Sequence, residues 1–165
     1  MSSIKDLAIL GGSPTFSEAL HVGRPNIGNY EEFIESIKLM FDNRWLTNHG
    51  PFVLAFEKEL QDFFGVRHCI VVNNATIALE IVIRALGMKG EVIVPSFTFI
   101  ATAHSLQWQD ITPVFADIDS ETHNINPRSV EKLITPRTTG IIGVHLWGRP
   151  ANISALEKIA DKHSL

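Results

Sequence analysis

Short apolar runs alternate with amphipathic segments along most of the chain. Four runs rich in β-branched residues predict buried strands, at residues 69–72, 92–94, 114–116 and 141–144. Both faces of each run are apolar, which is typical of strands in a parallel sheet covered on both sides. Helical patterns separate the runs. The alternation predicts an α/β fold built from βαβ units with right-handed crossovers.

The amphipathic segments predict the helices. One begins after the N-cap residue Asn29, and a second begins at Pro51 and ends at Gly65. Four more follow the predicted strands, at residues 75–86, 97–108, 127–134 and 153–162. Residues 1–28 are rich in glycine and proline, so they predict an extended N-terminal arm. The chain is therefore expected to consist of this arm, residues 1–28, and an α/β domain over residues 29–165.

The predicted domain is open at its C-terminal side. Its last helix ends at Leu165, and no strand follows. A crossover helix packs on a sheet because the chain then returns to a neighbouring strand. Without that strand, the sheet keeps an edge that another segment must cover. The pattern indicates an incomplete domain.

Composition narrows the class of protein. The chain has 165 residues, 45% of them hydrophobic, which is enough for a packed core. A net charge of −4 argues against a nucleic-acid or anionic-membrane partner, because either would favour a basic face. The single cysteine, Cys69, cannot form an internal disulfide, and the first residues do not resemble a signal peptide. These features predict a cytoplasmic protein that does not enter a membrane.

The end of the first predicted strand is a candidate anion site. There Asn74, Ala75 and Thr76 lead directly into a helix, whose free N–H groups and positive end attract an anion. The Thr76 hydroxyl adds a donor. An equally good interpretation is that Asn74 simply caps the helix. The glycine motifs of dinucleotide and P-loop sites are absent, so the sequence does not favour NAD, FAD or ATP.

The end of the second predicted strand carries aromatic residues, Phe97 and Phe99. They could stack on a flat ligand, although a lone phenylalanine more often packs in a core. Parallel strands present their carboxyl ends at one edge of a sheet, where ligands bind. An anion site beside an aromatic surface would suit a planar ring that carries a phosphate.

Other polar residues do not form a recognisable site. The seven histidines lack metal-ligand spacing, and no metal is predicted. Asp117 and Asp119 follow a predicted strand, where a turn explains them. Ser96 and Ser105 do not lie in a nucleophile elbow.

Six segments, in their order and spacing, resemble the DegT/DnrJ/EryC1/StrS family of pyridoxal-phosphate-dependent sugar aminotransferases. The resemblance runs from about residue 24 to the end. The segments are Arg44-Trp45-Leu46-Thr47-Asn48-His49-Gly50-Pro51, Asn73-Asn74-Ala75-Thr76-Ile77-Ala78-Leu79, residues 91–102, residues 113–119, Ile134-Thr135-Pro136-Arg137-Thr138 and Val144-His145-Leu146-Trp147-Gly148-Arg149-Pro150.

The resemblance implies part of a fold-type-I pyridoxal-phosphate transferase large domain, with a mostly parallel sheet and flanking helices. It also implies that Ala75 and Thr76 bind the cofactor phosphate and that Phe99 stacks on the cofactor ring. Thr47 matches a loop on the substrate side. Ala75 replaces a glycine of many members, with little consequence because the backbone N–H does the binding.

Two groups of the family are missing from these 165 residues. They are the aspartate that binds the ring nitrogen and the lysine that holds the cofactor covalently, so the chain alone contains no predicted catalytic residue and is not expected to transaminate. The resemblance implies the N-terminal part of a homodimeric enzyme that transfers an amino group, from glutamate, to a nucleotide-linked keto-sugar. Two alternatives stay open. One is a dehydratase of the same fold with a histidine at the lysine position, and the other is an inactive truncated remnant that acts through binding or dimerisation.

Overall fold

The computed structural model describes residues 4–165. The chain divides into two compact units, with the boundary between Glu59 and Leu60. Each unit is described by itself. Among the described residues, no helix combines the length and the hydropathy that a membrane span needs.

The N-terminal unit is made of short helical segments and an exposed chain. Two 3-10 helices, Ile4–Asp6 and Ala8–Leu10, come first. Residues 13–29 form neither helix nor strand, and the two 3-10 turns were not anticipated. The division into an arm, residues 1–28, and a domain, residues 29–165, stays a prediction. Helix α1, Tyr30–Asn43, begins where predicted, because the Asn29 side chain accepts hydrogen bonds from the N–H groups of the first turn. Helix α2 spans Pro51–Phe64 and crosses the boundary.

A parallel three-stranded sheet forms the centre of the C-terminal unit. Its strands are β1, Glu91–Pro95, β2, Thr112–Ala116, and β3, Thr138–Ile141, in the order β2-β1-β3. The central strand β1 is buried at every position. A strand that is buried along its whole length is expected where helices cover both faces of a parallel sheet.

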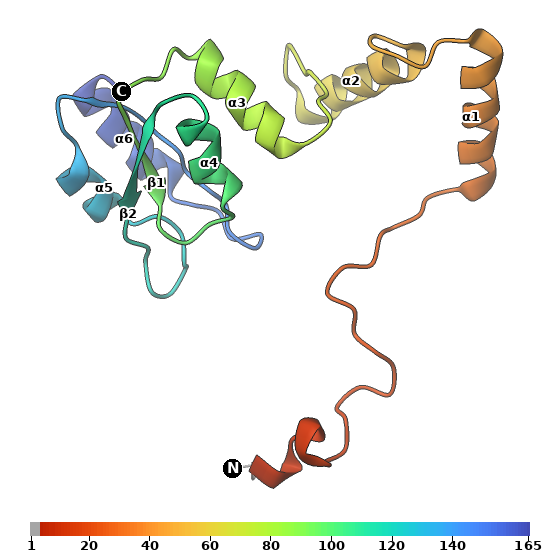
Figure 1. Cartoon of the computed structure of the whole chain (residues 1–165), viewed down its shortest axis with the longest axis horizontal. Helices are drawn as coiled ribbons and strands as arrows, with labels where there is room; N and C mark the ends of the chain where they lie inside the picture. The colour runs from red at the N-terminus through yellow and green to blue at the C-terminus, as the bar shows by residue number, and fades with distance from the viewer. Residues whose placement is uncertain (1–3) are drawn as a thin grey trace. The chain divides into compact units, whose positions relative to one another are not determined.

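Helices cover the two faces of the sheet (Figure 1). Because side chains alternate along a strand, Val92 and Val94 point to one face and Ile93 to the other. Val92 and Val94 pack with α3, Ala75–Ala85, and α4, Ala101–Gln107. Ile93 packs with α5, Pro127–Leu133, and α6, Ile153–His163. The predicted α/β class is confirmed.

Three predicted elements were wrong in detail. Residues 69–72 are not a strand of the sheet, because β-branched residues form a strand only where a neighbouring strand completes the hydrogen-bond ladder. The strand predicted at 141–144 is β3, which lies three residues earlier, because its ladder with β1 ends at Ile93. The helix predicted from Phe97 begins only at Ala101, since a turn follows β1.

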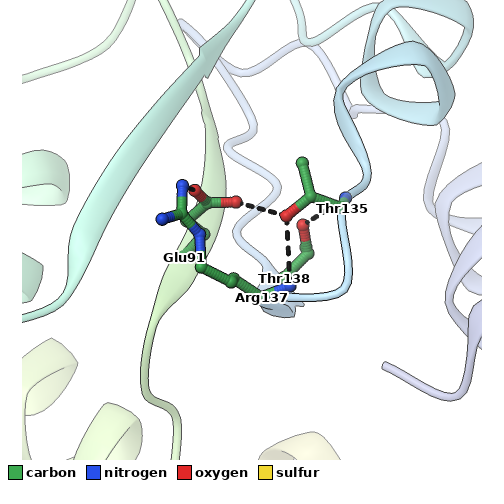
Figure 2. Close-up of polar contacts among 4 residues, drawn as sticks. All are labelled: Glu91, Thr135, Arg137 and Thr138. Carbon is green, nitrogen blue, oxygen red and sulfur yellow. Dashed lines mark hydrogen bonds and ion pairs between the residues drawn. The ribbon is translucent and has the colours of Figure 1, made fainter.

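A polar cluster ties the beginning of β1 to the turn before β3 (Figure 2). The carboxylate of Glu91, a buried residue, accepts a hydrogen bond of 2.6 Å from the Thr135 hydroxyl and forms an ion pair with Arg137. The Thr138 hydroxyl accepts a hydrogen bond of 2.9 Å from the Thr135 N–H. The cluster lies at the amino end of β1, away from the edge where ligands bind in such sheets. Residues 134–138, one of the six segments that resemble the family, therefore have a structural role.

Stability should depend on pH through Glu91. Its pKa is lowered mainly because the Thr135 hydroxyl donates to the carboxylate; Arg137 lowers it further and burial opposes both. A lowered pKa stabilises the fold above the unfolded-state value of about 4.3, and this contribution disappears as the pH falls through the folded-state value. We expect Glu91→Gln to lower the urea midpoint near neutral pH, with the gap to wild type closing as the pH falls through the lowered pKa of Glu91. Glu157→Gln on α6 is the control, and a gap that stayed constant with pH would contradict the assignment.

Candidate cofactor-binding site

A cavity of about 550 Å³ opens at the carboxyl end of β1. Three segments line it: the start of α3, the turn between β1 and α4, and the loop that follows β3. The lining residues are Ala75, Thr76, Leu79, Phe97, Thr98, Phe99, Ala101, Thr102, Val144, Leu146 and Trp147. The site therefore gathers segments that are about 70 positions apart in the sequence.

Three of the four predicted site residues lie on this cavity: Ala75, Thr76 and Phe99. The fourth, Thr47, belongs to the N-terminal unit, in the loop between α1 and α2. That loop is held by a hydrogen bond of 3.2 Å from the Trp45 indole N–H to the Asn48 carbonyl. A role of Thr47 towards the substrate stays a prediction.

The beginning of α3 presents donors to the cavity. Asn74 caps the helix, because its side chain accepts a hydrogen bond of 3.0 Å from the Ile77 N–H. The N–H groups of Ala75 and Thr76 precede the first carbonyl-bonded turn, so the helix itself provides no acceptor for them. Capping and anion binding are thus compatible, since the cap uses a different N–H. Together with the Thr76 hydroxyl and the positive helix end, these groups can hold a phosphate.

Phe99 is not a core residue. Its side chain is 76% exposed and borders the cavity, next to the start of α4. The Thr98 hydroxyl, next to Phe99 in the chain, lies 3.0 Å from the Thr102 hydroxyl in a hydrogen bond that ties the turn to α4. A hydrogen bond of 2.9 Å from the Ser96 N–H to the Ala116 carbonyl anchors the turn to β2. The exposed ring is therefore held on a fixed turn, where it can stack on a flat ligand.

Sequence reasoning missed the far wall of the cavity. Val144, Leu146 and Trp147 line it from the loop after β3. Their segment carried part of the family resemblance, but no local pattern assigned it a role. It reaches the cavity only because β3 lies beside β1.

Asp119 and Ser105, which the sequence pattern did not assign to a site, have structural roles. The Asp119 carboxylate accepts hydrogen bonds from the N–H groups of Glu121 and Thr122 and from the Thr122 hydroxyl, which confirms a turn. These bonds lower the pKa of Asp119, the Thr122 N–H most of all. The buried Ser105 hydroxyl donates to the Thr102 carbonyl. Within residues 4–165, no three histidine, cysteine or carboxylate side chains are grouped so as to hold a metal ion.

Solved structures share this arrangement. DesI, crystallised in the presence of its TDP-sugar product, superposes with a TM-score of 0.88 at 46% identity and covers 99% of this chain. NtdA from Bacillus subtilis, with bound pyridoxamine phosphate, superposes with a TM-score of 0.79 at 31% identity over 82% of this chain. The fold is that of the pyridoxal-phosphate-dependent aminotransferases.

The sequence model of the DegT/DnrJ/EryC1/StrS aminotransferase family matches residues 28–165, and the chain belongs to this family. The dTDP-4-amino-4,6-dideoxy-D-glucose transaminase of Escherichia coli is 40% identical over 148 residues, 90% of this chain. The GDP-perosamine synthase of Caulobacter vibrioides is 38% identical over 88% of it. The chain spans about 40% of the length of these relatives and 42% of DesI. Pyridoxal phosphate is the cofactor of the family.

Proposed function

We propose that these residues are the N-terminal part of a pyridoxal-phosphate-dependent aminotransferase that transfers an amino group from glutamate to a nucleotide-linked keto-sugar. In this proposal, residues 29–165 are the first portion of its large domain, and residues 1–28, of which the structure describes 4–28, are an arm. One observation carries the proposal: Ala75, Thr76 and Phe99, which the family resemblance singles out, lie on one cavity at the carboxyl edge of the sheet.

The cavity fits the cofactor in size and chemistry. Ligand pockets usually measure about 300–1,000 Å³, and this one measures about 550 Å³. The start of α3 supplies backbone donors and the Thr76 hydroxyl for a phosphate. Phe99 supplies an exposed ring for a pyridine. A ligand that is a planar ring with a phosphate satisfies both ends of the site at once.

Within the complete enzyme, this chain binds and orients. The bound cofactor supplies the electron-withdrawing ring that makes amino transfer possible. Thr76 and the start of α3 would hold its phosphate, and Phe99 would stack on its ring. The lysine and the aspartate that complete the family site are not among these 165 residues.

The proposal extends to the substrate, the partners and the location of the enzyme. The related enzymes are named for dTDP-, GDP- and UDP-linked sugars, which supports a nucleotide-linked sugar here. We assign Thr47 to the substrate side of the site, and we propose a homodimer. The single cysteine supports a cytoplasmic location.

The test uses the complete gene product, expressed from a genomic sequence read past Leu165. We expect it to bind pyridoxal phosphate with a yellow colour that borohydride abolishes. With glutamate, it should convert the 4-keto precursor of dTDP-4-amino-4,6-dideoxy-D-glucose, or a GDP- or UDP-linked counterpart, into the amino sugar. Loss of water without gain of nitrogen would support the dehydratase. A stop codon directly after Leu165 and no cofactor binding would support the inactive remnant.

Phe99→Ala should weaken pyridoxal phosphate binding about tenfold, since stacking contributes roughly 0.5–1.5 kcal/mol beyond buried area. Equilibrium dialysis of the complete gene product measures this. Phe99→Tyr keeps a stacking ring and should bind nearly as wild type does. Phe115→Ala is the matched control, because Phe115 is also exposed but lies on β2 outside the cavity. Equal losses in the Phe99 and Phe115 variants would refute stacking by Phe99.

A further inference from the structure

Three aromatic rings form a cluster at the cavity: Phe97, His123 and Trp147. Phe97 and Trp147 meet edge to face, with ring centroids 5.4 Å apart and an interplanar angle of 85°. His123 lies against both, at 6.2 Å from Phe97 and 6.0 Å from Trp147. Phe97 and Trp147 line the cavity, and the Trp147 side chain is 76% exposed. The indole thus contacts two rings while most of its side chain stays exposed.

The turn that carries Trp147 is built to hold it there. Trp147 has a φ of 50°, a left-handed conformation that a bulky residue rarely adopts. The turn is closed by a hydrogen bond of 2.9 Å from the Arg149 N–H to the Leu146 carbonyl. Backbone strain of this kind persists only where the surroundings impose it, and it is often found at ligand sites.

Asn124 imposes that conformation. It is a buried residue, only 4% exposed, and its amide spans the turn. The side-chain oxygen accepts a hydrogen bond of 3.1 Å from the Leu146 N–H. The side-chain NH₂ donates to the carbonyl groups of Arg149 and Pro150, at 3.2 Å each. One amide therefore satisfies backbone groups on both sides of Trp147.

We propose that Trp147, with Phe97 behind it, is the surface on which the hexose ring of the nucleotide-linked substrate packs, and that Asn124 is its positioning residue. This inference rests on the proposed function. The proposed function assigns the cofactor to Thr76 and Phe99, which would hold its phosphate and ring, and leaves Trp147 in the same cavity without a role. The group still to be accommodated is the sugar that must meet the cofactor, and an exposed indole suits the apolar C–H face of a hexose.

The test separates the contribution of the sugar to binding affinity from that of the nucleotide. Calorimetry on the complete gene product compares dTDP with dTDP-4-amino-4,6-dideoxy-D-glucose as probes. The wild-type protein should bind dTDP-4-amino-4,6-dideoxy-D-glucose more tightly than dTDP. Trp147→Ala should weaken binding of the nucleotide sugar about tenfold and leave the affinity for dTDP unchanged. Trp147→Phe should restore most of the lost affinity. Trp108→Ala is the matched control, because Trp108 is 71% exposed but lies outside this cavity.

Kinetics should separate binding from chemistry. With the 4-keto substrate, Trp147→Ala should raise KM about tenfold, while kcat and the affinity for pyridoxal phosphate stay as in wild type. A wild-type protein that fails to bind pyridoxal phosphate refutes the proposed function, and the calorimetric comparison still decides the role of Trp147. If Trp147→Ala lowers the melting temperature and leaves sugar affinity and KM unchanged, Trp147 is a packing contact and the inference fails.

Asn124→Asp tests the positioning role, because it keeps the acceptor for the Leu146 N–H but loses both donated hydrogen bonds. We expect it to raise KM with little change in kcat. The double variant with Trp147→Ala should be no worse in KM than Trp147→Ala alone, since Asn124 acts through the indole. Additive effects on KM would show that Asn124 contributes by another route and would overturn its assignment.

Discussion

Thr76→Val is expected to weaken pyridoxal phosphate binding about 10- to 100-fold in the complete gene product. The substitution keeps the size and branching of the side chain and removes only the hydroxyl. A hydrogen bond to a charged group contributes roughly 1.5–3 kcal/mol, which corresponds to this range. Thr76 is half-buried and lines the cavity beside the free N–H groups of α3. Equilibrium dialysis at several cofactor concentrations measures the loss.

The control for Thr76→Val is Thr112→Val. Thr112 is an exposed residue at the first position of β2, at the opposite end of the strands from the cavity. The Thr112→Val variant should bind the cofactor as tightly as the wild-type protein does. Competition with inorganic phosphate adds a second readout, because phosphate should compete less well in the Thr76 variant. Wild-type affinity in Thr76→Val would remove this hydroxyl from the phosphate site.

Gly90→Ala is expected to be the more damaging of two matched glycine substitutions, with a loss of about 2–5 kcal/mol in the free energy of unfolding. Gly90 has a φ of 65°, and an added Cβ would lie 2.7 Å from the Arg137 carbonyl oxygen. That oxygen accepts a hydrogen bond of 2.9 Å from the Glu91 N–H. The added methyl group would therefore push apart β1 and the turn that precedes β3.

Gly87 provides the control for Gly90→Ala. Its φ is 64°, nearly the same, but an added Cβ would meet no atom within 4 Å. Gly87→Ala should therefore show only the cost of the left-handed backbone, about 1–2 kcal/mol. Urea unfolding of both variants separates backbone strain from the steric clash. Equal losses would mean that the chain relaxes around Arg137 without cost.

Local chemistry made several elements predictable. Asn29 and Asn74 begin α1 and α3 because a short polar side chain can accept hydrogen bonds from the first turn of a helix. Pro51 begins α2, since a proline suits the first helical position. The candidate anion site at Thr76 was also predictable from local sequence, because the free N–H groups at the start of a helix can bind an anion. Such features depend on a few neighbouring residues.

Pairing partners were not predictable from local pattern. Residues 69–72 have a strand composition but lie outside the sheet, and the strand predicted at 141–144 is shifted to Thr138–Ile141. Strand propensity measures how well a side chain packs on the surface of a sheet. A strand also needs a neighbouring strand that pairs with it in register. Glu91 illustrates the point, because its partners Thr135 and Arg137 lie more than 40 positions away.

By itself, the sequence determined the α/β class, most helix starts and the family, and it predicted Thr76 and Phe99 as the two ends of a cofactor site. These follow from residue types and short spacings, which act through nearby backbone. Only the tertiary structure decided that Trp147 faces the same cavity and that Asn124 holds it there. The physical reason is the parallel sheet: it places β3 beside β1, and so brings together loops that no local pattern connects.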